Sequence, residues 1–153
     1  METSEFDKKF QELCSKMVEI AFEFVKRNQT AIDAVYVYGS VENKEFFYNN
    51  FYCVNGQTVK KHKVNTVSSQ QYNISSEQQF ALLKLGNRYL EETAHLFVAD
   101  GREVPTLMKM TYNPKTGHYN NDISYELQYS NDADRTDVEG FEEWFNEMKK
   151  SDS

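Results

Sequence analysis

The stretch Met110–Asp132, MTYNPKTGHYNNDISYELQYSND, carries the pattern that decides the fold. Apolar and polar residues alternate over residues 108–112 and again over 123–129, at the two-residue repeat of a half-buried strand. Between them, Asn113–Gly117 contains a proline with a fixed φ and a permissive glycine, so the chain can reverse there. The stretch therefore predicts a hairpin. Its second strand runs through Ile123, Tyr125, Leu127 and Tyr129, and we expect Tyr125 and Tyr129 to pack on one face of a sheet.

Periodicity elsewhere predicts three helices and three more strands. Apolar residues at steps of three and four indicate a helix over residues 6–27 and another from Ser75 or Ser76 to Asp100. Gly86 within that second helix predicts close packing against a neighbour or a slight bend. Strands are expected near residues 35–38, 46–54 and 57–64, with Asn55-Gly56 as a hairpin turn. Thr136 and Glu139 form a capping box for a last helix.

These elements give the order α-β-β-β-α-β-β-α. Because hairpins dominate, we predict an α+β fold in which an antiparallel β-sheet carries the helices on one face. The length of 153 residues fits a single domain over residues 1–153.

Charge and composition narrow the classes of function. The net charge of −7, from 24 acidic and 17 basic residues, repels phosphate backbones, so direct nucleic-acid binding is not expected. No apolar run is long enough for a membrane span, and the N-terminus does not resemble a signal peptide. Cys14 and Cys53 fall within a helical and a strand pattern, which favours two reduced thiols and a cytoplasmic location.

Catalytic and metal-binding patterns are weak. His62, His95 and His118 lie in different elements, with no nucleophile and base at a recognisable spacing and no glycine-rich phosphate loop. Residues 132–143 match the ligand positions of a calcium loop, but Asp137 stands where that loop needs glycine. The sequence therefore predicts neither an enzyme nor a cofactor nor a metal site.

An acidic block close to aromatic residues is the nearest feature to a binding motif. Some of these acids are expected simply to cap the last helix, where its positive end stabilises each by about 0.3–1 kcal/mol. The block also offers carboxylates that attract a basic protein and a ring that could anchor it. The candidate partner-binding residues are Asp132, Asp134, Asp137, Glu139, Glu142, Glu143 and Trp144.

The chain resembles the YezG-type immunity proteins, which are antitoxins of bacterial polymorphic nuclease toxins. The likeness lies in the long N-terminal helix, V-Y-V-Y-G at Val35–Gly39, F-F-Y at Phe46–Tyr48, D-G-R-E at Asp100–Glu103 and I-S-Y-E-L at Ile123–Leu127. It departs from the family at Val104-Pro105-Thr106, where a tryptophan is common. The resemblance implies a protein without enzymatic activity that binds a cognate toxin, a basic nuclease domain, and it leaves a homodimer open.

Two other hypotheses about the function remain open. Acidic secretion chaperones are similar in size, charge and element order, and they bind an extended effector segment instead of a folded toxin. An enzyme or small-ligand domain would require a deep pocket with convergent polar groups.

Overall fold

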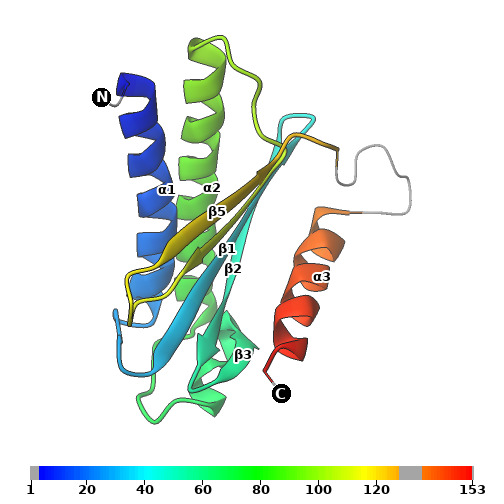
Figure 1. The fold of residues 1–153 in the computed structure, drawn as a ribbon. Helices are drawn as coiled ribbons and strands as arrows, with labels where there is room; N and C mark the ends of the chain where they lie inside the picture. Colours follow the sequence, from blue (N-terminus) through cyan, green and yellow to red (C-terminus); the bar gives the residue numbers. More distant parts are fainter. Residues whose placement is uncertain (1–3, 128–135, 153) are drawn as a thin grey trace.

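The computed structural model describes residues 4–127 and 136–152 (Figure 1). The order of its elements is α1 (Glu5–Phe24), β1 (Ile32–Glu42), β2 (Glu45–Val54), β3 (Gln57–Lys60), the 3-10 helix η1 (Lys61–Thr66), α2 (Ser76–Ala99), β4 (Leu107–Tyr112), β5 (Tyr119–Ser124) and α3 (Asp137–Lys150). The strands form one antiparallel sheet in the order β3-β2-β1-β4-β5. The predicted α+β fold is confirmed. Within the described ranges, no helix has the length and apolar character needed to cross a membrane.

The helices cover both faces of the sheet, so the expectation that they share one face is wrong. Helices α1 and α2 lie side by side on one face, and α3 packs on the other (Figure 1). The reason is visible in the central strand β1. Val35 and Val37 enter the core beneath α1 and α2, whereas Tyr36 and Tyr38 enter the core beneath α3. A strand that is apolar on both faces needs a cover on both faces.

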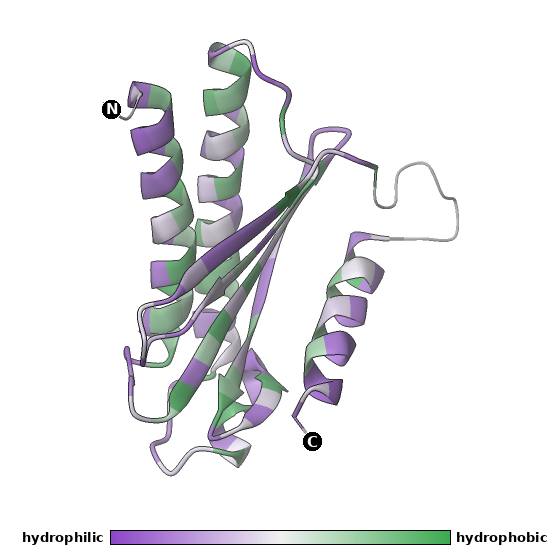
Figure 2. Cartoon of the chain, in the orientation of Figure 1, coloured by the Kyte–Doolittle hydropathy of each residue, from purple (hydrophilic) through white to green (hydrophobic). Residues whose placement is uncertain are grey.

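Two tyrosines of β2 tie the sheet to α1. The hydroxyl of Tyr48 donates to the carbonyl of Met17 at 2.7 Å, and that of Tyr52 donates to the carbonyl of Ala21 at 2.5 Å. Both rings are buried, and the two carbonyls lie one helical turn apart on the face of α1 that meets the sheet. Figure 2 shows the matching polarity of α1, which is hydrophobic towards its neighbours and hydrophilic on its outer side.

The helix starts predicted at Ser75 and Thr136 are confirmed, and one predicted end is wrong. Ser4, Ser75 and Thr136 each accept a hydrogen bond from the backbone N–H three residues on, as N-caps do. Helix α1 ends at Phe24 and not at residue 27, because Lys26 and Arg27 adopt left-handed conformations with φ of 54° and 52°.

The strand after the 113–117 turn also differs from the prediction. Tyr119 pairs with Tyr112 directly after the turn, and the pairing ends at Ser124 opposite Leu107. The strand is therefore Tyr119–Ser124, earlier than the alternation suggested, because a tight turn fixes the register from its own end. Tyr125 is 46% exposed and does not pack on the sheet as expected, and Tyr129 lies outside the described residues. Strand β3 is likewise shorter than predicted and continues as η1.

Candidate partner-binding surface

Helix α3 holds the described part of the acidic block. Thr136 caps its first turn by accepting from the N–H of Glu139 at 3.3 Å, and the first turn carries Asp137 and Glu139. Carboxylates at this end of a helix meet the positive end of its dipole. Lys149 and Lys150 occupy the last turn, where the dipole favours positive charge. Glu139 thus both stabilises the helix and adds negative charge to its exposed side.

Three glutamates lie along the outer side of α3. Glu139, Glu143 and Glu147 are exposed, and their spacing of four residues places them on one stripe of the helix. Asp137 is half-buried beside the N-terminal end of this stripe, and Asp132 and Asp134 lie outside the described residues. We call Glu139, Glu143 and Glu147 the α3 acidic stripe.

The other two predicted binding residues point towards the sheet. Glu142 forms an ion pair with Lys60 of β3 at 2.6 Å, and both side chains are partly covered. Trp144 is only 6% exposed. Its ring meets Tyr36 and Phe51 edge-on, with centroids 5.6 Å and 5.0 Å apart. The structure therefore corrects the expectation that Trp144 is a surface anchor, because its ring holds α3 against the sheet.

The aromatic packing beneath α3 makes the stripe a fixed feature of the molecule. Phe141 and Trp144 are buried among rings from β1 and β2. The far end of α3 is held as well, since Asp152 accepts hydrogen bonds from the N–H and the hydroxyl of Thr58 at 2.6 and 2.7 Å. Side chains carried by a docked helix are positioned more rigidly than side chains on a loop.

Metal-ligating side chains do not cluster in the described part of the chain, and both cysteines are free thiols. No group of three or more histidine, cysteine or acidic side chains lies within metal-binding reach in residues 4–127 and 136–152. Cys14 and Cys53 are unpaired thiols, as predicted. Burial raises the pKa of Cys14 to about 11, so this thiol is protonated at neutral pH and is a poor nucleophile.

Two of the grooves on the described surface are lined mainly by apolar surface. One groove of about 460 Å³ runs between α1 and β5, where Phe10, Cys14 and Ile123 form much of its lining. Another of about 640 Å³ lies between α2 and the β1–β2 hairpin. Its lining includes Phe46, Val98 and three more apolar residues, together with Asn43, Lys44, Glu91 and His95. Apolar surface makes up most of both linings.

Neither a protein-family model nor a curated protein matches the chain.

Sequence reasoning found the acids of α3 but not their division between two sides of the helix. Glu142 and Trp144 differ from Glu139, Glu143 and Glu147 by their position on the helical repeat. That difference becomes informative only when α3 is known to cover a second face of the sheet. The tyrosines at 36 and 38, which alternate with valines, are the signal in the sequence that could have indicated this second face.

Proposed function

We propose that the protein is an immunity protein that binds a cognate toxin domain, a basic nuclease, in the cytoplasm of the producing cell and blocks its active site. The observation that carries the proposal is the α3 acidic stripe, presented on a helix that is packed firmly against the sheet. The net charge of −7 supports it, since an acidic surface accelerates encounter with a basic partner. The resemblance to the YezG-type immunity proteins supplies the class of partner.

The stripe suits recognition more than catalysis. Carboxylates around an interface contribute to association rate and specificity, and apolar contacts beside them supply much of the affinity. Val138 is 49% exposed and lies next to Glu139 in the first turn of α3. A toxin cleft lined by lysines and arginines for binding nucleic acid would complement this surface.

Co-expression with the C-terminal toxin domain encoded by a neighbouring gene tests the proposal. The wild-type protein should restore growth and form a complex that weakens as salt concentration rises. Replacing Glu139, Glu143 and Glu147 by lysine should abolish protection. A matched variant with Glu12, Glu77 and Glu91 changed to lysine alters the net charge equally and should still protect, because these exposed residues lie on α1 and α2.

The results with the two variants show whether protection depends on the α3 acidic stripe or on net charge alone. If both fail equally, net charge and not the stripe is responsible. If both protect, and a variant with Asp132, Asp134 and Asp137 changed to lysine protects as well, the interface does not involve the acidic block. If the wild-type protein binds no neighbouring toxin, the immunity function itself is wrong.

A secretion chaperone is the second candidate, supported by the apolar groove beside α2, where Val98 is 66% exposed. Limited proteolysis of the partner separates the two. A chaperone would protect an otherwise unfolded segment of the partner, whereas an immunity protein would bind a domain that is already resistant to the protease.

A further inference from the structure

The two edges of the sheet differ in whether side chains bond to their outward-facing backbone groups. On the side of β2 and β3, three outward-facing backbone N–H groups are each capped by a side chain. Tyr48 donates to Asn87 at 2.8 Å, Asn50 donates to Asn49 at 2.8 Å, and Thr58 donates to Asp152 at 2.6 Å. Capped donors cannot pair with another strand, and covering an edge in this way prevents association between sheets.

Strand β5 forms the opposite edge, and no side chain of the described residues caps its backbone. Asn113 donates to His118 at 2.8 Å where the hairpin closes, and pairing with β4 then alternates along the strand. The backbone groups of Tyr119, Asn121 and Ile123 consequently point away from β4. Among residues 4–127 and 136–152, no side chain or backbone group forms a hydrogen bond with these outward N–H and C=O groups.

Strand β5 carries few of the features that usually protect an edge strand, and Asp122 is its one charged residue. Its sequence, YNNDIS, contains no lysine, arginine or proline. Its register with β4 is continuous over all six residue pairs, so no bulge twists the edge away. Tyr119 on this strand is 42% exposed. An edge with free donors and acceptors, and with so few protecting features, is a template for a further strand.

We propose that β5 pairs antiparallel with β5 of a second copy of the chain, about a twofold axis at Asn121, to give one continuous sheet across a dimer. Only outward-facing residues can form hydrogen-bonded pairs across the seam. Centring the pairing on Asn121 aligns all three of them, with Asn121 opposite its own copy and Tyr119 opposite the partner's Ile123. Each pair exchanges two hydrogen bonds, which is the most that this strand can form with itself.

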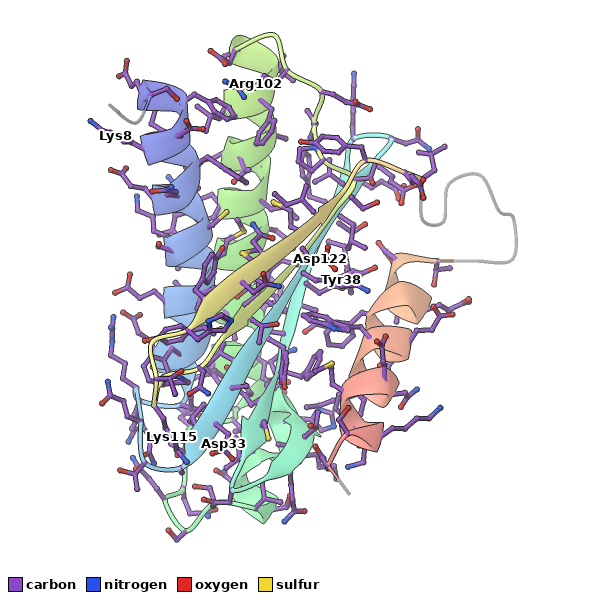
Figure 3. The ribbon with its side chains drawn as sticks, viewed as in Figure 1. Lys8, Asp33, Tyr38, Arg102, Lys115 and Asp122 are labelled. Atoms are coloured by element: carbon purple, nitrogen blue, oxygen red, sulfur yellow. The ribbon has the colours of Figure 1, made fainter. Side chains whose placement is uncertain are left out.

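The side chains of β5 are complementary to themselves in this register. Tyr119 meets the partner's Ile123, an aromatic and β-branched pair of the kind that stabilises antiparallel strands. On the other side of the sheet, where Figure 3 labels Asp122, the Asp122 carboxylate lies opposite the partner's Asn120, whose amide can donate to it. No two like charges are directly opposed. This complementarity favours a second copy over an unrelated strand as the occupant of the edge.

The proposal is independent of the immunity function, and it is tested on the purified protein alone. Analytical ultracentrifugation of the wild-type chain should show a monomer–dimer equilibrium that moves towards dimer as concentration rises. Asn121→Pro removes an outward N–H that does not bond to β4, so the variant should fold normally while its dimer dissociates about tenfold more readily or worse. Thermal unfolding of the monomer serves as the control for folding.

Substitution at one position tests the register. Asn120→Lys would face the partner's Asp122 at two symmetric points and should tighten the dimer, whereas Asn120→Asp would oppose like charges and should weaken it, each by about 2- to 30-fold. The controls are Asn146→Lys and Asn146→Asp, at an exposed position on α3, and both should leave the stability of the dimer unchanged. A wild-type protein that is monomeric at every concentration, or a dimer indifferent to Asn121→Pro, would overturn the proposal. So would a shift in the same direction for both Asn120 variants.

Discussion

Gly86 of α2 packs directly against the ring of Tyr48 on β2. A Cβ at position 86 would overlap three atoms of that ring. The ring has no room to retreat, because Tyr48 is 1% exposed and its hydroxyl is bound to the Met17 carbonyl of α1. A glycine inside a helix costs about 1 kcal/mol relative to alanine, and here that cost permits α2 to approach the sheet. The prediction of close packing at Gly86 is confirmed.

Gly86→Ala should therefore destabilise the protein although alanine is the better helix former. We expect the free energy of unfolding to fall by about 1–3 kcal/mol, as for other overpacked cores, measured by chemical denaturation. The same substitution in a Tyr48→Leu background, where the ring is absent, should cost much less. An equal cost in both backgrounds would show that the overlap with Tyr48 is not the cause.

Gly140→Ala should loosen α3. A Cβ at position 140 would clash with the hydroxyl of Tyr38, which points from β1 towards α3 (Figure 3). We expect a loss of about 1–2 kcal/mol, reported by the fluorescence of Trp144, the single tryptophan of the chain. In a Tyr38→Phe background, which lacks the clashing oxygen, the penalty of Gly140→Ala should shrink. An unchanged penalty would place the strain elsewhere in α3.

The buried tyrosines should make the protein sensitive to alkali. Burial raises the pKa of Tyr48 and Tyr52 well above the ordinary value near 10, and that of Tyr36 to about 12. Below about pH 10 these tyrosines are protonated in both the folded and the unfolded state, and their contribution to the free energy of unfolding is complete. That contribution is lost as pH rises through their raised pKa values. Denaturation midpoints should fall steeply above about pH 10, and less steeply in Tyr48→Phe or Tyr52→Phe variants.

These two Phe variants also report on the bonds to α1. At neutral pH each should lose about 0.5–1.5 kcal/mol, because a helix carbonyl loses its buried hydroxyl donor. A variant as stable as the wild type at neutral pH would mean that the bond contributes no net stability. The alkaline slope tests the burial of the ring separately, since it depends on ionisation and not on the bond at neutral pH.

Lys61 should be replaceable with a gain in stability. It is 7% exposed, and its Nζ donates to Asn49 at 2.6 Å. Burial, with a smaller effect of Lys60, lowers the pKa of Lys61 from 10.5 to about 8. Below about pH 8 the lysine is charged in both states and its desolvation cost is complete, whereas between about pH 8 and 10.5 the cost declines. Lys61→Met should raise the free energy of unfolding by about 1–3 kcal/mol at pH 7.

The control for that gain is Lys63→Met, which changes the same charge at an exposed position two residues on. It should have little effect at any pH. The gain in free energy of unfolding of Lys61→Met over the wild type should become smaller as pH rises from about 8 towards 10, before tyrosine ionisation begins. A gain that does not depend on pH would show that better packing, and not relief of a buried charge, is responsible.

Local signals in the sequence were sufficient to predict most helices, strands and turns of the fold. The caps at Ser4, Ser75 and Thr136, the turn at Asn55-Gly56 and the turn at Asn113–Gly117 all depend on residues close together in the chain. Asn113 illustrates this, because its carbonyl accepts from Gly117 and its side chain accepts from Lys115 and Thr116. Such hydrogen bonds form in any context in which the chain turns, so they can be predicted without knowing the fold.

The predictions that the structure contradicts concern segments in which distant contacts override a local pattern. Tyr125 and Leu127 continue an alternating pattern, but β4 begins at Leu107, opposite Ser124, and so offers them no partner. Glu142 and Trp144 belong to an acidic segment, but packing turns them towards Lys60 and the rings of β1 and β2. Only three of the predicted binding residues, Asp137, Glu139 and Glu143, are therefore seen on or beside the outer surface of α3.

By itself, the sequence determined the kind and order of the elements, because periodicity, capping and turn chemistry act within a few residues. Only the tertiary structure shows that helices cover both faces and that α3 presents a stripe of three glutamates. The same holds for the edges, where side chains of the described residues cap β2 and β3 but not β5. Each of these depends on groups brought together from far apart in the chain, such as Thr58 and Asp152. Their energies depend on burial and geometry, which no local pattern contains.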